Sequence, residues 1–414
     1  MSVAVFHPGT QHSWQTALAL QQLGQLEWYA TSIFHQPDRW PYRLERYAPE
    51  VLAARLRAEF GRFSHPGLDP ALVRTGGLAE WFERIANRAG FRQLAQRIDA
   101  FGNRRFVAQI AAEIASEQNF ALWGYNGSSR HAFELAKQHG RTCILDRTIG
   151  DFRVYNAMMD EVAERYGDWF VPTERRVEQR QIDLDDREYQ LADRIAVGSP
   201  FAADTLASVC NDPTITSKVR VVRYCYDELL FGNMPRPLSR PSNQPVRFLF
   251  MGLVIPRKGI HHVLEAIAQL PPNAAELTIV GDLRIPQHTF ARYADRVTYR
   301  RTVPRSEVPA IMASHDVLLL PSYFEGAGIV LYEALAAGCA LIQSDRCADA
   351  VTAETGLLLP ELSTDALLQA MITAIEDRAQ LTGWRSAAQQ AALDYTFARY
   401  RENIAGLLGE SGLT

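Results

Sequence analysis

The chain has 414 residues, which is long enough for two domains. Its formal net charge of −4 argues against bulk nucleic-acid binding. Its five cysteines are scattered and never form C-x-x-C, which disfavours a disulfide framework or a zinc site and favours a reducing compartment. No apolar run approaches the roughly 20 residues of a membrane span, and the N-terminus lacks a basic region followed by an apolar one. We therefore expect a cytoplasmic protein.

Short apolar runs alternate with helical patterns through the first half of the chain. Residues 2–6 predict a buried strand, a loop with Gly9 follows, and Ser13 is a candidate N-cap for a helix over 14–23. Further strands are predicted at 27–33, 120–125, 142–145, 194–198 and 219–224, and helices over 130–139 after Ser129, within 154–191, and from Pro200 after Ser199. This alternation is typical of a doubly wound parallel sheet.

The segment from Gln36 to about Glu117 departs from this pattern, because arginines alternate with aromatic residues. Between residues 36 and 110, thirteen Lys and Arg against eight Asp and Glu give a local charge of +5. Arg84, Arg88 and Arg92 are four apart and predict one ridge of a helix. Two interpretations stay open: an amphipathic core helix with a solvated basic face, or a surface helix set against anionic lipid headgroups.

Prolines mark the clearest linker, from Asp227 to Pro245. The predicted organisation is an N-terminal domain over 1–226, a linker over 227–245, a second domain over 246–394, and a final helix over 395–414. The second domain repeats strand and helix patterns, with strands predicted at 247–251, 277–280, 296–300, 316–320, 340–343 and 357–359.

The first loop of the second domain contains Gly252, Arg257, Lys258 and Gly259, directly before a predicted helix. A basic pair at the beginning of a helix can neutralise a diphosphate and stabilise a leaving nucleotide. The alternative is a pair of exposed cations in a turn.

Residues 316–338 combine a strand, a glycine-containing loop and a helix. The apolar run 317–320 is stopped by Pro321, the helical spacing begins at Ile329, and Gly338 is a plausible end of the helix. In an open α/β sheet this motif places free backbone N–H groups at the carboxyl end of a strand, where anionic ligands bind.

Two carboxylates flank that loop. Glu325 lies in it and Glu333 lies eight residues later, roughly 12 Å along a helix axis. Carboxylates on both sides of N–H donors suit a nucleotide sugar, since one can accept the ribose hydroxyls and the other those of the transferred sugar. The alternative is a loop charge and a solvated helix residue, although Glu333 has no Lys or Arg within one turn.

Residues 321–344, PSYFEGAGIVLYEALAAGCALIQS, closely resemble the Glu-x7-Glu signature of glycosyltransferase family 4, the retaining GT-B enzymes. The resemblance covers about residues 246–393 and is looser before them. It implies an α/β fold of two doubly wound, Rossmann-like domains facing each other across a cleft, with the final helix returning to the first domain. It also implies sugar transfer from a nucleoside-diphosphate sugar to an acceptor hydroxyl in bacterial glycolipid, polysaccharide or other glycoconjugate synthesis.

The resemblance assigns roles residue by residue. Glu325, Lys258 and Arg257 are the implied catalytic residues, and Asp146 is an acceptor-side candidate where many family members have a histidine. The implied donor-binding residues are Glu333, Gly326, Ala327, Gly328, Gly252, Gly9, Thr10 and Val303. No cofactor is expected, and no metal, because the cations and the helix end would stabilise the leaving group.

The sequence departs from the family pattern at two further positions. Leu253 stands where an arginine usually follows the first glycine, so Arg257 is the expected substitute. Arg301 replaces a glycine, which affects the contact to the base near Val303. The expected partners are a nucleotide-sugar donor, a glycan, lipid-linked or small-molecule acceptor, and an anionic membrane surface on the inner face of the plasma membrane. An epimerase of the same fold and a non-catalytic nucleotide-sugar binding subunit are the alternative functions.

Overall fold

A computed structural model describes the structure of most of the chain, namely residues 1–9, 12–35, 42–50, 52–53, 63, 65, 67–75, 106–171, 176–210, 212–237, 241 and 243–410. By contacts the chain divides into two compact units: the first is Met1–Arg147, Asp183–Ala196 and Arg401–Thr414, and the second is Thr148–Ile182 and Val197–Tyr400. The domain boundaries inferred from the sequence stay a prediction. Thr10 and the basic ridge Arg84–Arg92 lie outside the described residues.

The first sheet has seven strands in the order β3-β2-β1-β4-β5-β6-β7. Their bounds are β1 Ser2–His7, β2 Leu26–Thr31, β3 Val73–Thr75, β4 Phe120–Tyr125, β5 Cys143–Arg147, β6 Arg194–Val197 and β7 Val219–Val221. Strand β1 pairs in parallel with both β2 and β4, so the strand order reverses between β1 and β4. The apolar runs predicted as strands in this half of the chain all lie within or around these strands.

The second sheet has six strands in the order β10-β9-β8-β11-β12-β13, all described pairings being parallel. Their bounds are β8 Val246–Met251, β9 Ala275–Val280, β10 Val297–Arg300, β11 Val317–Leu320, β12 Ala340–Gln343 and β13 Gly356–Leu358. Each agrees with its predicted strand to within about two residues at either end. The order 3-2-1-4-5-6 in this sheet is that of a doubly wound Rossmann-like domain.

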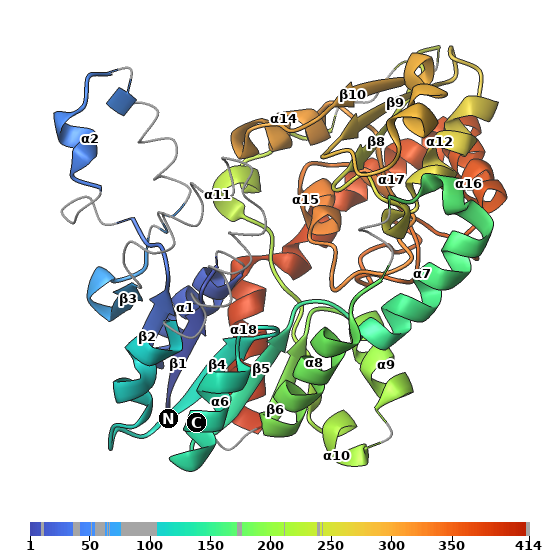
Figure 1. Cartoon of the computed structure of the whole chain (residues 1–414). Coiled ribbons are helices and arrows are strands. Elements are labelled where there is room, and N and C mark those ends of the chain that lie inside the picture. The colour runs from blue at the N-terminus through green and yellow to red at the C-terminus, as the bar shows by residue number, and fades with distance from the viewer. Residues whose placement is uncertain are drawn as a thin grey trace. The chain divides into compact units, whose positions relative to one another are not determined.

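Helices connect the strands (Figure 1). They are α1 Ser13–Gln22, α2 Leu44–Tyr47, α6 Arg130–Gln138, α7 Phe152–Tyr166, α8 Gln179–Leu191, α9 Pro200–Val209, α10 Pro213–Thr216, α11 Glu228–Phe231, α12 Ile260–Gln269, α13 Gln287–Ala291, α14 Val308–Ala313, α15 Val330–Ala336, α16 Thr364–Glu376, α17 Arg378–Ala391 and α18 Phe397–Glu410. In the second unit α12 packs on α16, and α15 packs on α17.

The core of the second unit lies around β8, β9, β11 and β12, whose apolar side chains are almost fully buried. Trp169 belongs to this same core, although it follows α7 in the short turn Gly167–Trp169. Trp169 thus connects the segment Thr148–Ile182, which belongs to the second unit, with the core of that unit.

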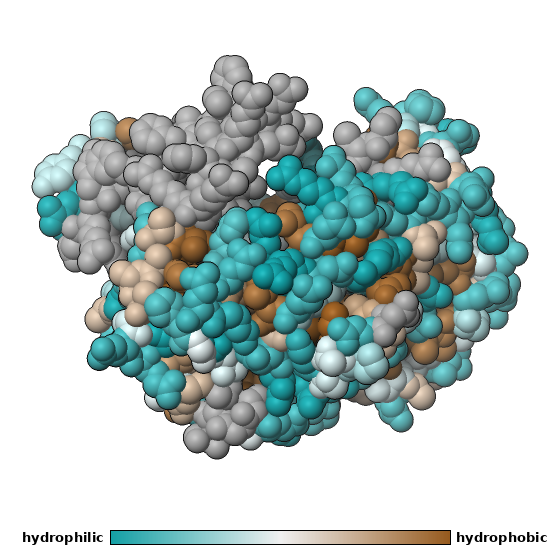
Figure 2. All heavy atoms as spheres, turned by 60° about the horizontal axis from the view of Figure 1, so that its bottom comes forward, coloured by the Kyte–Doolittle hydropathy of each residue, from teal (hydrophilic) through white to brown (hydrophobic). Residues whose placement is uncertain are grey.

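Figure 2 shows one face of the molecule, on which hydrophilic side chains cover most of the described surface. Among the described helices, none combines the length and the apolar character that crossing a membrane requires.

Three serines precede or begin helices, and the structure shows which of them cap a helix N-terminus. Ser199 caps α9 as predicted, because its hydroxyl accepts a hydrogen bond of 3.1 Å from the backbone N–H of Ala202. The prediction for Ser13 is wrong: Ser13 is the first residue of α1, and its hydroxyl is hydrogen-bonded to the Tyr29 hydroxyl at 2.9 Å. Ser129 precedes α6, but its hydroxyl donates to the Tyr125 carbonyl instead of capping the helix.

The N-terminus of α6 is capped by a residue distant in sequence, Glu188 of α8. Its buried carboxylate accepts hydrogen bonds from the backbone N–H groups of Gly127 and Ser129, both at 2.8 Å, and of Arg130 at 3.1 Å. Burial raises the pKa of Glu188 to about 7, although the three N–H groups act in the opposite direction. Because an uncapped N-terminus leaves buried donors without partners, this carboxyl connects α8 to α6.

We predict that Glu188→Ala lowers the free energy of unfolding by about 3 kcal/mol, because it leaves N–H donors buried without acceptors. Chemical denaturation at constant pH measures the loss. Glu134→Ala is the control, since that carboxylate forms partly exposed ion pairs with His131 of α6 and Arg187 of α8, and its effect should be below about 0.5 kcal/mol. Equal losses in the two variants would contradict the capping role.

Glu188→Gln tests how the charge of Glu188 affects stability, since the amide keeps a carbonyl oxygen that can accept the hydrogen bonds but carries no charge. The folded-state pKa of Glu188 lies above that of an unfolded carboxyl, so ionisation destabilises the folded protein. The wild type should therefore lose stability relative to Glu188→Gln as the pH rises from about 5 to 8.

Candidate active site

The second sheet brings the two loops singled out by the sequence next to each other. Strands β8 and β11 are parallel neighbours, with Val317 opposite Phe248 and Leu318 opposite Leu249. Both strands therefore end at the same edge of the sheet, where the strand order reverses. Ligands of open α/β sheets bind at this position.

Glycines allow the loop after β8 to approach the loop after β11. Gly259 ends the short turn Pro256–Lys258 in a left-handed conformation, with φ of 69°. A Cβ atom there would lie 2.0 Å from the Pro321 carbonyl oxygen, so only glycine fits at this position. Gly252 also has a positive φ, of 140°, and the stem of Lys258 lies against it.

Glu325 is the centre of the site. Its Oε1 atom lies 2.5 Å from Lys258 Nζ and 3.1 Å from Arg257 Nη1, and accepts a hydrogen bond of 3.2 Å from the Ser322 hydroxyl. Burial raises the pKa of Glu325, but the charges of Arg257 and Lys258 and the bond from Ser322 outweigh it and bring the pKa to about 2. Glu325 is therefore an ionised carboxylate at neutral pH, held by two cations.

A chain of hydrogen bonds connects Tyr323, beside Glu325, to the α12 and α16 helices. The Tyr323 hydroxyl lies 2.7 Å from His262 Nε2, His262 Nδ1 lies 2.9 Å from Thr364 Oγ1, and Thr364 donates to Glu265 at 2.6 Å. Burial lowers the pKa of His262 to about 4, so its ring is neutral at pH 7. Because the Thr364 proton goes to Glu265, His262 donates from Nδ1 and accepts the Tyr323 proton at Nε2.

The glycine-containing loop after Glu325 is also tightly fitted. A Cβ atom on Gly326 would lie 1.8 Å from the Thr148 carbonyl oxygen, and the Ser199 hydroxyl donates to the Gly326 carbonyl. Gly328 has a φ of 77°. In the part of the chain that the structure describes, the N–H groups of Ala327 and Gly328 have no hydrogen-bond acceptor. These two donors lie directly before α15, as an anion site requires.

Glu333 lies in α15 and is buried, but it has a partner that the sequence did not indicate. Arg305 Nη1 donates to Glu333 Oε2 at 3.0 Å, and Arg305 Nη2 donates to Oε1. This ion pair cannot be predicted from the residues within one helical turn of Glu333, because Arg305 belongs to another element, the turn Arg305–Glu307. The only sequence signal is that Arg305 lies two residues after Val303.

Val303 and Arg301, the two positions predicted near the nucleotide base, both follow β10. Val303 is half-buried in the segment between β10 and the turn with Arg305. Asp282, which follows β9, pairs at the surface with Arg284 at 3.2 Å and with Arg301 at 3.3 Å. Arg301, which replaces a family glycine, is thus engaged with Asp282.

Two predicted site residues belong to the first unit. Gly9 follows β1, and its N–H donates to His7 Nδ1 at 2.9 Å. Asp146 is buried in β5 and accepts a hydrogen bond of 3.4 Å from the Trp123 indole. Both positions lie at the carboxyl ends of their strands, and their roles toward a substrate stay predictions.

Comparison with known proteins agrees with this geometry. Residues 245–377 match the family model Glycosyl transferases group 1. The lipopolysaccharide glucosyltransferase WaaG of Escherichia coli is 31% identical over 147 residues, which cover 33% of this chain and 39% of that protein. The chain matches between about a quarter and a half of the length of the first curated relatives.

Solved structures match over almost the whole length. A sucrose-phosphate synthase from Thermosynechococcus elongatus has a TM-score of 0.65 at 17% identity, with 99% of both chains covered. Anabaena HepE, solved with UDP-glucose, has a TM-score of 0.60 at 14% identity, with 99% of this chain and 100% of that chain covered. The fold is therefore the two-domain GT-B class of Rossmann-like domains.

Within that class, the Glycosyl transferases group 1 model matches the part of the chain that holds the second sheet and the site around Glu325. The resemblance that the Glu-x7-Glu signature indicated is confirmed.

We predict that Glu325→Gln lowers stability most at neutral pH. The folded-state pKa of Glu325 lies below the unfolded value, so its stabilisation is present above about pH 4.5 and is lost as the pH falls toward 2. The shift corresponds to on the order of 3 kcal/mol at pH 7. Denaturant unfolding of wild type and variant between pH 7 and pH 3 measures the difference, which should shrink at low pH.

Glu276→Gln is the matched control, because this carboxylate is exposed on β9 and pairs with Arg247 at the surface. It should change stability by less than about 0.5 kcal/mol at either pH. If the difference in unfolding free energy between wild type and Glu325→Gln did not depend on pH, Glu325 would not be stabilised as an ionised carboxylate.

Proposed function

We propose that the protein is a retaining glycosyltransferase that moves a sugar from a nucleoside-diphosphate sugar to an acceptor hydroxyl in bacterial glycoconjugate synthesis. The observation that carries the proposal is the buried cluster in which Lys258 and Arg257 both contact Glu325. It lies at the strand-order reversal of a sheet that matches this glycosyltransferase family. The relative that acts on lipopolysaccharide supports the glycoconjugate role.

Each group has a role that its chemistry suits. Lys258 and Arg257 hold the diphosphate, together with the N–H groups of Ala327 and Gly328. Glu325 binds the hydroxyls of the transferred sugar, and Glu333 binds the ribose. In the reaction the bond from the sugar C1 atom to the diphosphate oxygen breaks, and a bond from C1 to the acceptor oxygen forms on the same face, with loss of the acceptor proton. The cations offset the charge that develops on the leaving diphosphate.

We propose that this charge compensation needs no metal ion. The chain does contain one Asp-x-Asp sequence, at Asp183 and Asp185. Asp185 is buried in α8 and pairs with Arg147 at 2.5 Å, which gives this carboxylate a structural partner in the first unit. Activity should therefore survive EDTA, and full loss of turnover that manganese restores would contradict this part of the proposal.

Hydrolysis and transfer assays across UDP-, GDP- and ADP-sugars test the function. Lys258→Ala and Glu333→Ala should each lower kcat/KM by about two to three orders of magnitude, as for the loss of one charge-stabilising group. Arg247→Ala is the control, because it removes an arginine that pairs with Glu276 at the surface of the second sheet. An epimerised donor, or tight donor binding without any transfer over a broad acceptor panel, would refute the glycosyltransferase.

We also propose that the acceptor is presented at an anionic membrane on the cytoplasmic side, by the basic segment between residues 36 and 110. Most of this segment lies outside the described residues, and its local charge of +5 supports the proposal. Each basic residue near such a surface contributes about 1 kcal/mol. Sedimentation with anionic liposomes should exceed that with neutral ones at low salt, and the difference should disappear at high salt. Equal binding to both kinds of liposome would contradict the membrane proposal and favour a soluble acceptor.

A further inference from the structure

Arg305 makes the most specific contact of the site that the sequence did not indicate. It begins the turn Arg305–Glu307 and reaches Glu333 of α15, which is 28 residues later in the chain. Its side chain is 50% exposed, whereas that of Glu333 is only 7% exposed. Two parallel N–H···O bonds join the two groups, the geometry in which arginine recognises a carboxylate most specifically.

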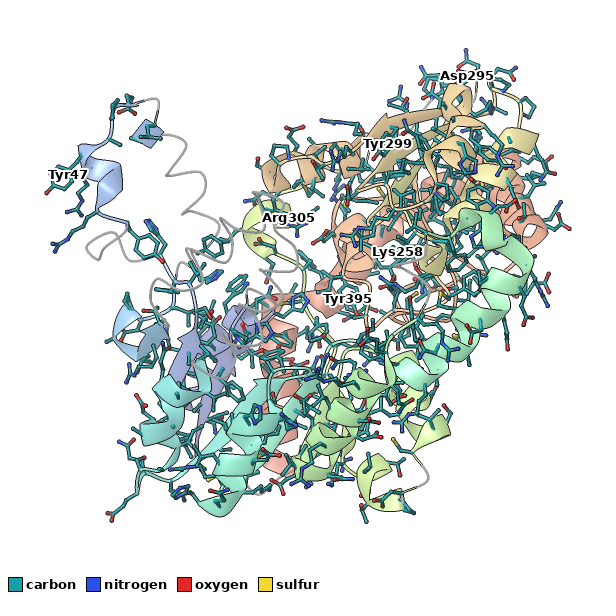
Figure 3. The ribbon with its side chains drawn as sticks, in the orientation of Figure 1. Tyr47, Lys258, Asp295, Tyr299, Arg305 and Tyr395 are labelled. Carbon is teal, nitrogen blue, oxygen red and sulfur yellow. The ribbon has the colours of Figure 1, made fainter. Side chains whose placement is uncertain are left out.

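The position of the guanidinium is fixed by more than the ion pair. It lies over the ring of Phe231 in α11, 5.6 Å from the ring centroid. Figure 3 shows Arg305 beside this helix. The neighbouring acid Glu307 pairs with Arg300 at 2.7 Å, so it does not compete for Arg305. Burial lowers the pKa of Arg305, but the Glu333 carboxylate outweighs it and raises the pKa above its usual value.

The chemistry of the pair leaves acceptors for a ligand. An ionised carboxylate has two oxygens with about four lone-pair sites, and Arg305 occupies one site on each oxygen. One acceptor site on each oxygen remains, which matches the two neighbouring hydroxyls of a ribose. The guanidinium also compensates a buried negative charge that would otherwise repel an anionic diphosphate nearby.

We infer that Arg305 is a positioning residue for ribose recognition: by its two-point contact it fixes the carboxylate of Glu333 in the orientation that accepts the 2′- and 3′-hydroxyls of the nucleotide. This inference rests on the proposed function and deepens it. A positioning role differs from simple charge compensation of Glu333, because positioning requires the planar fork of arginine and any cation would compensate the charge.

Binding of nucleoside diphosphates tests the inference. Calorimetry with UDP, GDP and ADP identifies the preferred base, and the same base is then compared with its 2′-deoxy form. A lost hydrogen bond to a charged group corresponds to about a 10- to 100-fold weaker binding of the deoxy form by the wild type. The ratio of the Kd for the 2′-deoxy form to the Kd for the ribonucleotide should fall below about 3 in Arg305→Ala, close to its value in Glu333→Gln. Arg305→Lys should reduce it nearly as much, because lysine lacks the fork.

Arg247→Ala is the matched control, because Arg247 lies near the beginning of β8, its side chain is 42% exposed, and it pairs with Glu276 rather than Glu333. It should keep the wild-type ratio. If Glu333→Gln abolishes the discrimination while Arg305→Ala keeps it, the positioning role is refuted. Tighter binding of the ribonucleotide by Arg305→Ala would refute it as well, since Arg305 would then block the site. If the wild type binds none of the three diphosphates, the proposed function itself fails.

Discussion

The ion cluster of Glu325 with Lys258 and Arg257 is the interaction on which the site depends. Buried charges are costly unless they are paired, and all three groups are largely removed from solvent. Their pairing requires that two loops touch at the carboxyl ends of β8 and β11. That contact exists because Gly259 lies directly against the Pro321 carbonyl, where a side chain would collide. Backbone shape and charge pairing therefore support each other.

The two carboxylates of the signature are each compensated, but in different ways. Glu325 is shared by two cations through one oxygen, whereas Glu333 is held by one arginine through both oxygens. Three cations against two carboxylates leave a net positive charge, which suits an anionic ligand. The hydrogen bonds from Tyr323 to the neutral ring of His262, and from that ring to Thr364, support the loop without adding a cation. The site thus combines rigid placement with an excess of positive charge.

Much of the fold could be predicted because it depends on local patterns. Strand 317–320 and the glycine at the end of α15 were both predicted correctly, since apolar runs and glycines with positive φ reflect short-range constraints. Capping was predicted less well. Ser199 satisfies the N-terminus of α9, whereas Ser13 bonds to Tyr29 and Glu188 replaces Ser129. A serine before a helix offers a cap, but tertiary neighbours decide whether it is used.

The sequence by itself determined the class of fold, the resemblance to a family, and the positions of both carboxylates and of the basic pair. These features lie within single strand–loop–helix segments, where residue spacing specifies geometry. Only the tertiary structure decided which charges meet. Lys258 and Glu325 are 67 residues apart, and Arg305 and Glu333 are 28 apart. No local periodicity connects such pairs, because their distance is set by the order of strands in the sheet and by the loops at its edge.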